Sequence, residues 1–430
     1  MEKPLLERFK EIHPQIRARF PQLEKDLYGS PRIYLNNGAG TVTVDSAADA
    51  MAQTFRTFHP MPGSSFPAEE ATMDLHWTVR QIAADFLNAD YREEISFHLS
   101  ATNALFNLAT SLGSILTEEH NLVVTDLDHM ANVTPWEEIC GKQRGSEVRR
   151  IPINDEGYLD MDRVRACVDR RTGLFAVTLA SNGFGTIAPL KELISYIKEK
   201  SPDCLVCVDA VHHALHGSLD VQDMGCDFLV FSGYKIYGPM LGVLYGKKSV
   251  LERLKPYRVE TNKNEIPFKF EQGMLNNAVL AALASALEYH LWLGELIFDP
   301  IDRTEQGRIG QFQSVMNAVA LYDQQISRVI LQGFQQFPRE KFRCFGVSDP
   351  SRVMERDPTF AFEIPALKPE EIKRRLWEME GIQIGDGNHY SAAVYRHLDR
   401  SSLCRASFAH YDSEETAQTF LEALRRLIDE

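Results

Sequence analysis

The chain has 430 residues, of which 44% are hydrophobic and 25% charged, and its formal net charge at pH 7 is −14. These proportions are typical of a globular protein with two or three domains, or one large domain and an appendage, and so acidic a chain is a poor partner for nucleic-acid phosphates. Because no apolar run approaches the roughly 18 residues of a membrane span, and residues 1–20 carry charges every few positions, we expect a cytoplasmic protein with no membrane partner.

The first predicted elements are one or two helices in residues 1–29. A strand then leads into a glycine turn in the stretch YLNNGAGT, residues 34–41, where Asn37 and Ala39 flank the glycine. Asn-Gly is one of the commonest turn signals, so these residues alone predict a turn and no chemistry.

A second strand, residues 95–99, ends in Ser-Ala-Thr-Asn, after which apolar residues recur at helical spacing. A strand that turns through small hydroxyl residues into a helix presents free backbone N–H groups and the positive end of the helix dipole. Ala101 and Thr102 are therefore candidates for binding a phosphate, although a hydroxyl residue here is more often only a helix cap.

Two further apolar strands end in polar residues. Residues 121–128 lead to His129, and residues 174–180 lead to Ser181 and Asn182. A lone histidine after a strand usually has no catalytic role. The alternation of strands and helices across residues 30–290 predicts a mostly parallel sheet covered by helices on both faces.

Three short apolar runs, CLVCV, DFLVF and GVLYG, lie within residues 204–246 and are typical of strands buried on both faces. The first run ends at Asp209, and the second ends in Ser232, Gly233, Tyr234 and Lys235. An open α/β sheet binds its ligand at the carboxyl ends of its strands, so we expect this acid and this amine at one site.

Pyridoxal phosphate (PLP) uses such a pair. Its aldehyde needs a lysine to form an imine, and its pyridine nitrogen needs an acid that keeps it protonated. A lysine in an apolar pocket also has a lowered pKa, which suits attack on a carbonyl. Solvated residues are the commoner interpretation of a lysine and an aspartate at strand ends, so spacing alone does not establish the cofactor.

A metal site is the alternative for this stretch, with the possible ligands Asp209, His212, His213 and His216. These residues suit zinc only if a turn brings them together, and no distant fourth ligand is evident, so we expect no metal. Seven scattered cysteines do not resemble a disulfide framework. Cys204 and Cys207 lie on opposite faces of a strand and are expected in the core.

Beyond residue 290 we expect long helices to about residue 337, and residues 290–350 carry no motif. A smaller α+β segment follows, with expected elements at residues 359–364 (strand), 369–380 (helix) and 403–411 (strand). We therefore divide the chain into a large domain, residues 30–290, and a small domain, residues 1–29 and 291–430.

Several motifs together resemble the class V aminotransferases, a family of PLP enzymes, and within it the cysteine desulfurases. The stretch VDAVHHALHGSLDVQDMGCDFLVFSGYKIYGP is similar to the family's VDAAQ, DF and SGHK segments with their Gly-Pro turn. DHMANVTPW is similar to EHHANIVPW, CRASFAHYDSEE to CRASLAMYNTHEE, LSATN to SGATE, and YLNNGAGT to YLDNAATT. The resemblance covers roughly residues 30–290 and 380–430.

This resemblance implies PLP fold type I, an α/β fold whose large domain has a mostly parallel, seven-stranded sheet beside a smaller α+β domain. The cofactor contacts that it implies are Ala101, Thr102, His129, Asn182, Asp209, His212, Ser232, Tyr234 and Lys235. In the family's pattern Lys235 is the Schiff-base lysine, Asp209 the partner of the pyridine nitrogen, and His129 the residue stacked on the ring. His212 stands where many members have Gln and Tyr234 where they have His, and both replacements can hydrogen-bond.

Substrate contacts are implied as well. Arg405 takes the position that grips the substrate α-carboxylate, a task suited to a planar bidentate donor. Asn37 and Ala39 lie in the loop that approaches this carboxylate. A homodimer is also implied, but Met274 replaces the threonine that reaches the neighbouring subunit's cofactor phosphate.

The resemblance fails at the nucleophile. Desulfurases carry a cysteine in RTGHHC, whereas this chain has Tyr390 at that position and Gly385 in place of a second arginine. Cys404 is no substitute, because it adjoins Arg405 in a strand and faces the opposite way. Without a thiolate there is no ordinary persulfide relay.

We therefore expect a PLP enzyme in which Lys235 abstracts an α proton and a β leaving group is expelled, most simply a C–S lyase acting on a cysteine-derived amino acid. His389 and Tyr390 are the candidate acids for a leaving thiol. Aminotransfer and epimerisation are alternative reactions, in which the proton returns to the cofactor carbon or to the α carbon. A third alternative is a PLP-binding protein without catalysis. The presence of Arg405 argues against it, because such a protein needs no residue that binds a substrate carboxylate.

Overall fold

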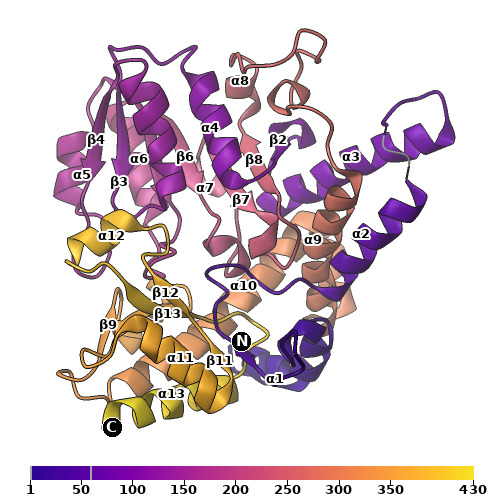
Figure 1. Ribbon diagram of the computed structural model, residues 1–430. Coiled ribbons are helices and arrows are strands. Elements are labelled where there is room, and N and C mark those ends of the chain that lie inside the picture. The colour runs from indigo at the N-terminus through magenta and orange to yellow at the C-terminus, as the bar shows by residue number, and fades with distance from the viewer. Residues whose placement is uncertain (1, 59–60) are drawn as a thin grey trace.

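Seven strands form the largest sheet of the computed structural model, which describes residues 2–58 and 61–430 (Figure 1). In spatial order these strands are β2 (Ile95–His98), β8 (Gly242–Gly246), β7 (Phe228–Ser232), β6 (Leu205–Asp209), β5 (Thr172–Thr178), β3 (Asn121–Thr125) and β4 (Glu147–Ile151). Strands β3 to β7 pair in parallel, while β8 pairs antiparallel with both β7 and β2. The mostly parallel sheet predicted from the sequence is confirmed.

The central strands of this sheet are buried on both faces, because successive residues enter different hydrophobic cores. On β5, Phe175 belongs to one core and Leu174 to the other. Cys204 and Cys207 also lie in different cores, as predicted. The helices along the sheet are α4 (Ala101–Leu112), the π-helix Trp136–Lys142, α5 (Met161–Cys167), α6 (Leu190–Lys200), α7 (Val221–Met224) and α8 (Lys248–Leu251).

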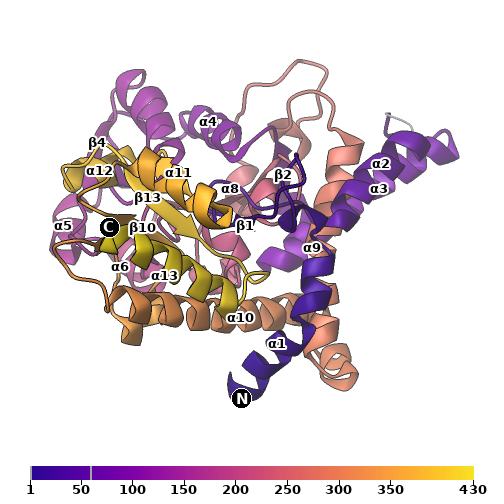
Figure 2. The same ribbon diagram turned by 60° about the horizontal axis from the view of Figure 1, so that its bottom comes forward.

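Long helices form a second layer. They are α1 (Glu2–Ala18), α2 (Asp45–Thr57), α3 (Pro67–Leu87), α9 (Asn277–Ile297) and α10 (Pro300–Phe334). Helix α9 packs against α2, α3 and α10, and Figure 2 shows α10 running past α13 with α1 crossing near its end. The predicted domain boundary at residue 290 falls inside α9, and the division of the chain into domains stays a prediction.

The smaller α+β part contains a four-stranded antiparallel sheet, in the order β12 (Gly385–Gly387), β13 (Leu403–Ser407), β10 (Thr359–Glu363) and β9 (Arg343–Phe345). Its helices are α11 (Pro369–Glu380), α12 (Ala392–His397) and α13 (Glu414–Asp429). β1 (Ile33–Tyr34) pairs in parallel with β11 (Ile382–Gln383), which joins the N-terminal segment to this part.

The strand expected at residues 403–411 is shorter in the structure, where β13 ends at Ser407. Residues 409–412 turn instead, because the Asp412 carboxylate accepts a hydrogen bond from Ala409 N at 2.9 Å, and Ala409 O accepts one from Asp412 N at 2.8 Å. Among the described helices, none has the length and apolar composition needed to cross a bilayer.

Candidate active site

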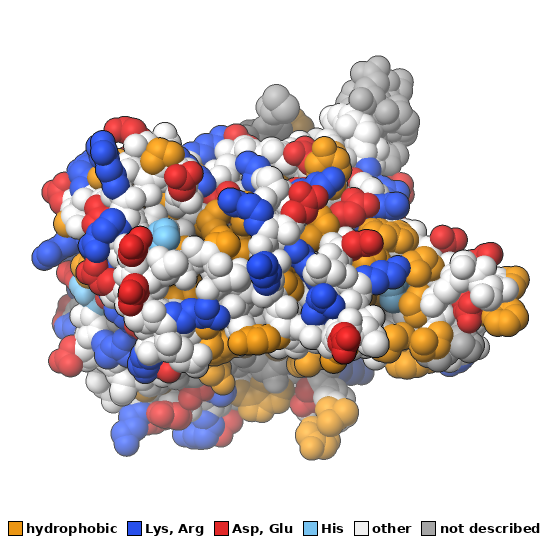
Figure 3. Space-filling model, turned by 90° about the horizontal axis from the view of Figure 1, so that it is seen from above, with side chains coloured by type: hydrophobic (Ala, Val, Ile, Leu, Met, Phe, Trp, Pro, Cys, Tyr) orange, Lys and Arg blue, Asp and Glu red, His pale blue; other side chains and the backbone are white. Residues whose placement is uncertain are grey.

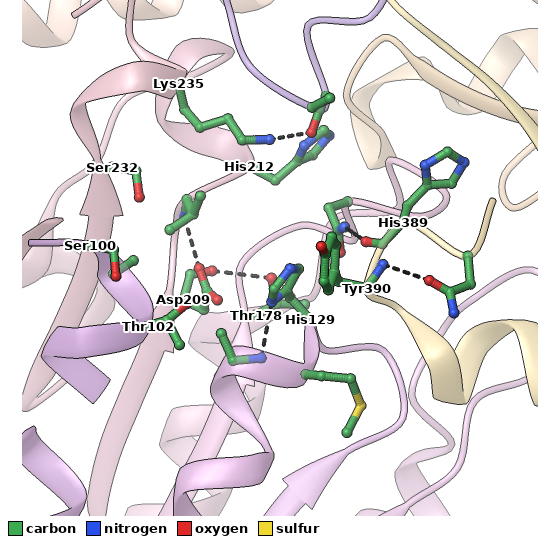
Figure 4. A pocket seen from close by; sticks show the side chains of 18 of the residues that line it. Ser100, Thr102, His129, Thr178, Asp209, His212, Ser232, Lys235, His389 and Tyr390 are labelled. Carbon is green, nitrogen blue, oxygen red and sulfur yellow. Dashed lines mark hydrogen bonds between the residues drawn. The ribbon is translucent and has the colours of Figure 1, made fainter. Parts of the chain in front are cut away.

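A cavity of about 890 Å³ lies at the carboxyl ends of β5, β6 and β7, facing the loop that follows β12 (Figure 4). Residues from both parts of the chain line it. Those singled out from the sequence that line it are Ala39, Ala101, Thr102, His129, Asn182, Asp209, His212, Ser232, Tyr234, Lys235, His389, Tyr390 and Arg405. Figure 4 shows Ser100, Thr102 and Ser232 at one end of the cavity and His389 and Tyr390 at the other.

Asn37 is the exception, because its side chain is fully buried outside the cavity lining. Its Nδ2 donates to Ser407 O at 2.8 Å, and its Oδ1 accepts a hydrogen bond from the Tyr411 hydroxyl. The Asn37 side chain therefore holds the turn against residues near β13, and the neighbouring Gly38 and Ala39 face the cavity.

Gly38 allows this turn to approach the arginine of β13. A Cβ at this position would lie 2.5 Å from Ser407 Oγ and 2.9 Å from Arg405 Cζ, which is closer than real Cβ atoms come to their neighbours. The Gly38 carbonyl also accepts a hydrogen bond from Lys235 Nζ. The turn thus contacts both the amine and the guanidinium of the site.

Lys235 and Asp209 are 5% and 4% exposed. Burial, and then the charge of Arg405, lowers the pKa of Lys235 to about 7, while Asp209 opposes the change. Burial raises the pKa of Asp209 to about 6, although Val211 N donates to its Oδ1 at 2.9 Å. The site therefore holds an amine that is partly unprotonated near neutral pH beside a carboxyl group that readily accepts a proton.

The first turn of α4 forms a cradle at one end of the cavity. Ser100 caps the helix by accepting a hydrogen bond from Asn103 N at 3.0 Å, and the N–H groups of Ala101 and Thr102 lie in a turn with no preceding helical carbonyl. Gly242 of β8 packs directly beneath, where a Cβ would lie 2.2 Å from the Ser100 carbonyl carbon. A phosphate group fits such a helix end.

Two histidines face the cavity in the neutral form. Burial, together with Lys235 and Arg405, lowers the pKa of His129 to about 4, and its Nδ1 accepts a hydrogen bond from Ala131 N at 3.0 Å. Burial also lowers the pKa of His212 well below its ordinary value, and neither of its nitrogens has a hydrogen-bond partner within the described ranges.

Arg405 on β13 is 2% exposed, and burial lowers its pKa to about 10. Its Nη1 donates to Asn182 O at 2.7 Å, whereas its Nε is buried and has no partner in the part of the chain that is described. A guanidinium with an unused donor in a cavity is suited to binding a carboxylate.

The loop after β12 is held over the cavity by hydrogen bonds. Met130 N donates to Tyr390 O at 2.9 Å, and Asn182 Nδ2 donates to His389 O at 2.7 Å. His389 and Tyr390 both have left-handed backbone angles, φ 50° and 59°, which are strained for residues with side chains. The His129 and Tyr390 rings lie 5.5 Å apart between centroids.

Asn182 was expected to bind the cofactor, and its amide is engaged with this same loop. Besides the contact to His389, its Oδ1 accepts a hydrogen bond from Ser391 Oγ at 2.6 Å. An amide nitrogen carries two hydrogens, so the second one is available to a group in the cavity.

No cysteine among the described residues lines the cavity. Cys404, which adjoins Arg405, points away from it, with Sγ 3.5 Å from Pro369 O, and burial raises the pKa of its thiol. The prediction that Cys404 faces away from the site is confirmed.

Sequence reasoning missed some of the lining. Thr178, the last residue of β5, pairs in register with Asp209 and lines the cavity beside it. Its hydroxyl donates to Ala180 O at 2.8 Å. The position of Thr178 at a strand end could have suggested a place in the site. Only the pairing of β5 with β6, however, shows that it lies beside Asp209. Asp386 and Asn388, in and after β12, were missed because the loop carries no apolar pattern.

These residues fit PLP. The cavity provides a buried amine of lowered pKa, a carboxyl group for a ring nitrogen, a helix end for a phosphate, and a histidine with two unpartnered nitrogens. The structure thus meets the chemical needs that were inferred from the strand ends.

Comparisons with known proteins agree. The sequence profile of the aminotransferase class-V family matches residues 33–320 and 313–420. A cysteine desulfurase of Pectobacterium carotovorum is 30% identical over 435 positions, which cover 96% of this chain and 97% of that protein, and one of Klebsiella pneumoniae is 30% identical over 429 positions with the same coverage.

Two solved structures share the fold. A cysteine desulfurase of Escherichia coli superimposes with a TM-score of 0.80 at 24% identity, covering 97% of this chain and 98% of that one. The apo cysteine desulfurase of Thermococcus onnurineus gives a TM-score of 0.82 at 22% identity over the same shares of the two chains.

Proposed function

The chain belongs to the class-V aminotransferase family and is a PLP-dependent enzyme of the cysteine desulfurase kind, and we propose that it catalyses β-elimination from a cysteine-derived amino acid. In this reaction an S-substituted cysteine and water give a thiol, pyruvate and ammonium. The observation that carries the proposal is the cavity lining, which contains Tyr390 and no described cysteine. By the sequence resemblance Tyr390 takes the position of the desulfurase nucleophile. A persulfide relay needs a thiolate there.

PLP bound in the cavity would supply an electron sink for the negative charge that develops at the substrate α carbon. Lys235 would hold its aldehyde carbon, Asp209 its ring nitrogen, and the first turn of α4 with Ser232 its phosphate. With a pKa of about 7, the Lys235 amine is available as a base for the α proton at neutral pH.

Arg405 would bind the substrate α-carboxylate. Its guanidinium is buried, fixed on one side by Asn182 O, and has an unused Nε donor. Because the Gly38 turn touches both Arg405 and Lys235, the carboxylate and the α proton would be held on the same side of the cavity.

The leaving thiol would take its proton from the loop after β12. Burial, and next Arg405, lowers the pKa of His389 to about 2, so its imidazolium form is scarce at neutral pH. The Tyr390 side chain lines the cavity while staying exposed, and its hydroxyl is a hydrogen-bond donor. We assign the acid role to Tyr390 and leave His389 as a neutral hydrogen-bonding group.

The test is to incubate the PLP-loaded protein with cysteine and with S-alkyl cysteines and to measure every product. Pyruvate and thiol in equal amounts are expected, at a rate that falls at least tenfold in Tyr390→Phe. Alanine with a protein-bound persulfide would overturn the proposal in favour of desulfuration. Amino transfer to a keto acid would indicate an aminotransferase, and loss of optical activity an epimerase.

A matched control separates catalysis from cofactor binding. Lys235→Ala should release no pyruvate from any of these substrates. If no amino acid altered the visible absorbance of the wild-type protein with bound cofactor, the chain would be a PLP-binding protein without catalysis.

A homodimer is part of the same proposal. Hydrophobic side chains gather on the side of the molecule formed by α2 and α3 (Figure 3), where Phe55 and Phe66 are 70% and 64% exposed. Leu99 and Met240, which flank the α4 cradle, are also exposed. Apolar patches of this kind mark protein interfaces. Sedimentation of the PLP-loaded protein should give the mass of two chains, and a concentration-independent monomer would refute the dimer.

A further inference from the structure

A line of buried polar side chains leads from the cavity into the protein interior. His212 lines the cavity, and its ring lies 5.6 Å from that of His216 between centroids. His216 Nδ1 in turn donates to Asp323 Oδ2 at 2.7 Å, and these two side chains are 1% and 4% exposed. Asp323 comes from α10, in the stretch that carries no sequence motif.

Several atoms of this line have no hydrogen-bond partner among the described residues. They are both ring nitrogens of His212, Nε2 of His216 and Oδ1 of Asp323. Buried polar atoms in native proteins almost always have a hydrogen-bond partner, so four unpaired atoms in one line indicate missing connections. A nitrogen of His212 and one of His216 lie within 4.8 Å, a gap that a bridging water closes.

We propose that His212, His216 and Asp323 form a proton relay that exchanges protons with the cofactor cavity. The inference rests on the proposed function in one respect, that the cavity holds PLP. His212 is the group that touches the cofactor, and His216 and Asp323 are positioning residues that act through it.

The direction of each hydrogen bond follows from Asp323. Its carboxylate accepts Nδ1–H of His216, so neutral His216 presents a lone pair at Nε2. That lone pair accepts the N–H of His212 through a bridging water, and the other nitrogen of His212 then presents a lone pair to the cavity. When a group in the cavity gives that nitrogen a proton, His212 passes its other proton to His216. His212 stays neutral, and His216 becomes a cation beside the Asp323 carboxylate.

The surroundings disfavour a positive charge on His212, whereas His216 has the Asp323 carboxylate beside it at 2.7 Å. Burial, then His216, Lys235 and Arg405, lowers the pKa of His212. Burial raises the pKa of Asp323 to about 6, and the hydrogen bond from His216 opposes this rise. Other titratable groups also interact with the relay. They are His213 and Asp357, paired at 2.9 Å, and Tyr237, Tyr322, His410 and Asp412.

A metal ion is the competing interpretation, because ligand atoms of His212, His216 and Asp357 lie within 4.8 Å of one another. Tetrahedral zinc with bonds of about 2.0–2.1 Å brings its ligand atoms to roughly 3.3 Å of one another. Asp357 is moreover already paired with His213. The structure thus fits a relay better than a metal centre.

The experiment follows the visible absorbance of the bound cofactor against pH in the PLP-loaded protein. His216→Asn keeps a donor for Asp323 but cannot carry the proton, and Asp323→Asn removes the carboxylate. In wild type the lone pair of His212 stabilises a protonated group in the cavity. Both variants should therefore lower the apparent pKa of the chromophore by about one unit. The matched control His213→Asn, which breaks the neighbouring histidine–aspartate pair, should leave that pKa within about 0.3 units.

If all three variants had the same chromophore pKa as the wild type, the relay would be overturned. A stoichiometric metal ion in the wild type that is lost in His216→Asn would also overturn it. If the variants fail to fold, ¹⁵N spectra of histidine-labelled wild type decide the matter. They should show neutral His216 protonated at Nδ1, and protonation at Nε2 would refute the proposal. Pyruvate release without the pKa shift rejects the relay alone, whereas the shift without pyruvate release supports the relay and rejects the proposed reaction.

Discussion

Replacing Gly242 by alanine tests whether the first turn of α4 binds the cofactor phosphate. The new Cβ would lie 2.2 Å from the Ser100 carbonyl carbon and 2.6 Å from Ala101 N, where ordinary contact begins at 3.4 Å. Both neighbours are backbone atoms, so the helix end itself must shift by about 1 Å. Overpacking of this kind costs about 1–3 kcal/mol, which corresponds to about 5- to 150-fold in affinity if the cradle moves.

The assay compares the affinity of the protein for PLP with that for pyridoxal, which lacks the phosphate. Gly242→Ala should lower the ratio of these two affinities about 5- to 150-fold and leave pyridoxal binding nearly unchanged. Gly294→Ala in α9 is the control, because its Cβ would meet Val315 at an ordinary 3.6 Å. An equal loss of affinity for both ligands, or none, would refute the assignment of the phosphate site.

Three further predictions concern buried charges. Arg405→Lys keeps the charge but loses the bidentate fork, and it should weaken amino-acid binding about 10- to 100-fold with unchanged cofactor absorbance; a wild-type KM would contradict the carboxylate role. The folded-state pKa of Lys235 is lowered to about 7 from the usual lysine value near 10.5. The free-energy penalty of burying this amine in the apoprotein is therefore largest below pH 7, and it shrinks as the pH rises from 7 to 10.5. Lys235→Met should therefore raise the denaturant midpoint of the apoprotein most at pH 7 or below, and a gain that does not shrink toward pH 10 would contradict the burial argument. Arg80 binds both oxygens of Glu271, at 2.7 and 2.6 Å, with both side chains buried. Arg80→Met should therefore lower the free energy of unfolding by about 3–5 kcal/mol, and the double variant with Glu271→Gln should lose less than the two single variants together. A double variant that loses the full sum of the two single-variant losses would show that the pair is not coupled.

The strand ends explain why so much of the site could be predicted from the sequence. Asp209 and Lys235 each follow a buried apolar run, and strands of a parallel sheet end at one edge, so they share a cavity. The direction of Asn37 was not predictable, because it is set by Tyr411, 374 positions away. Asp323 was missed for the same reason, since its partner His216 lies 107 positions earlier.

The cavity draws on both ends of the chain, from the Gly38 turn to Arg405. During synthesis the turn would leave the ribosome long before β11 and β13, the strands that hold it in place. A nascent chain therefore cannot assemble the complete cavity until its last strand has emerged. Binding of the vitamin-derived cofactor would therefore require the whole cavity, and a chain truncated before Arg405 should not bind it.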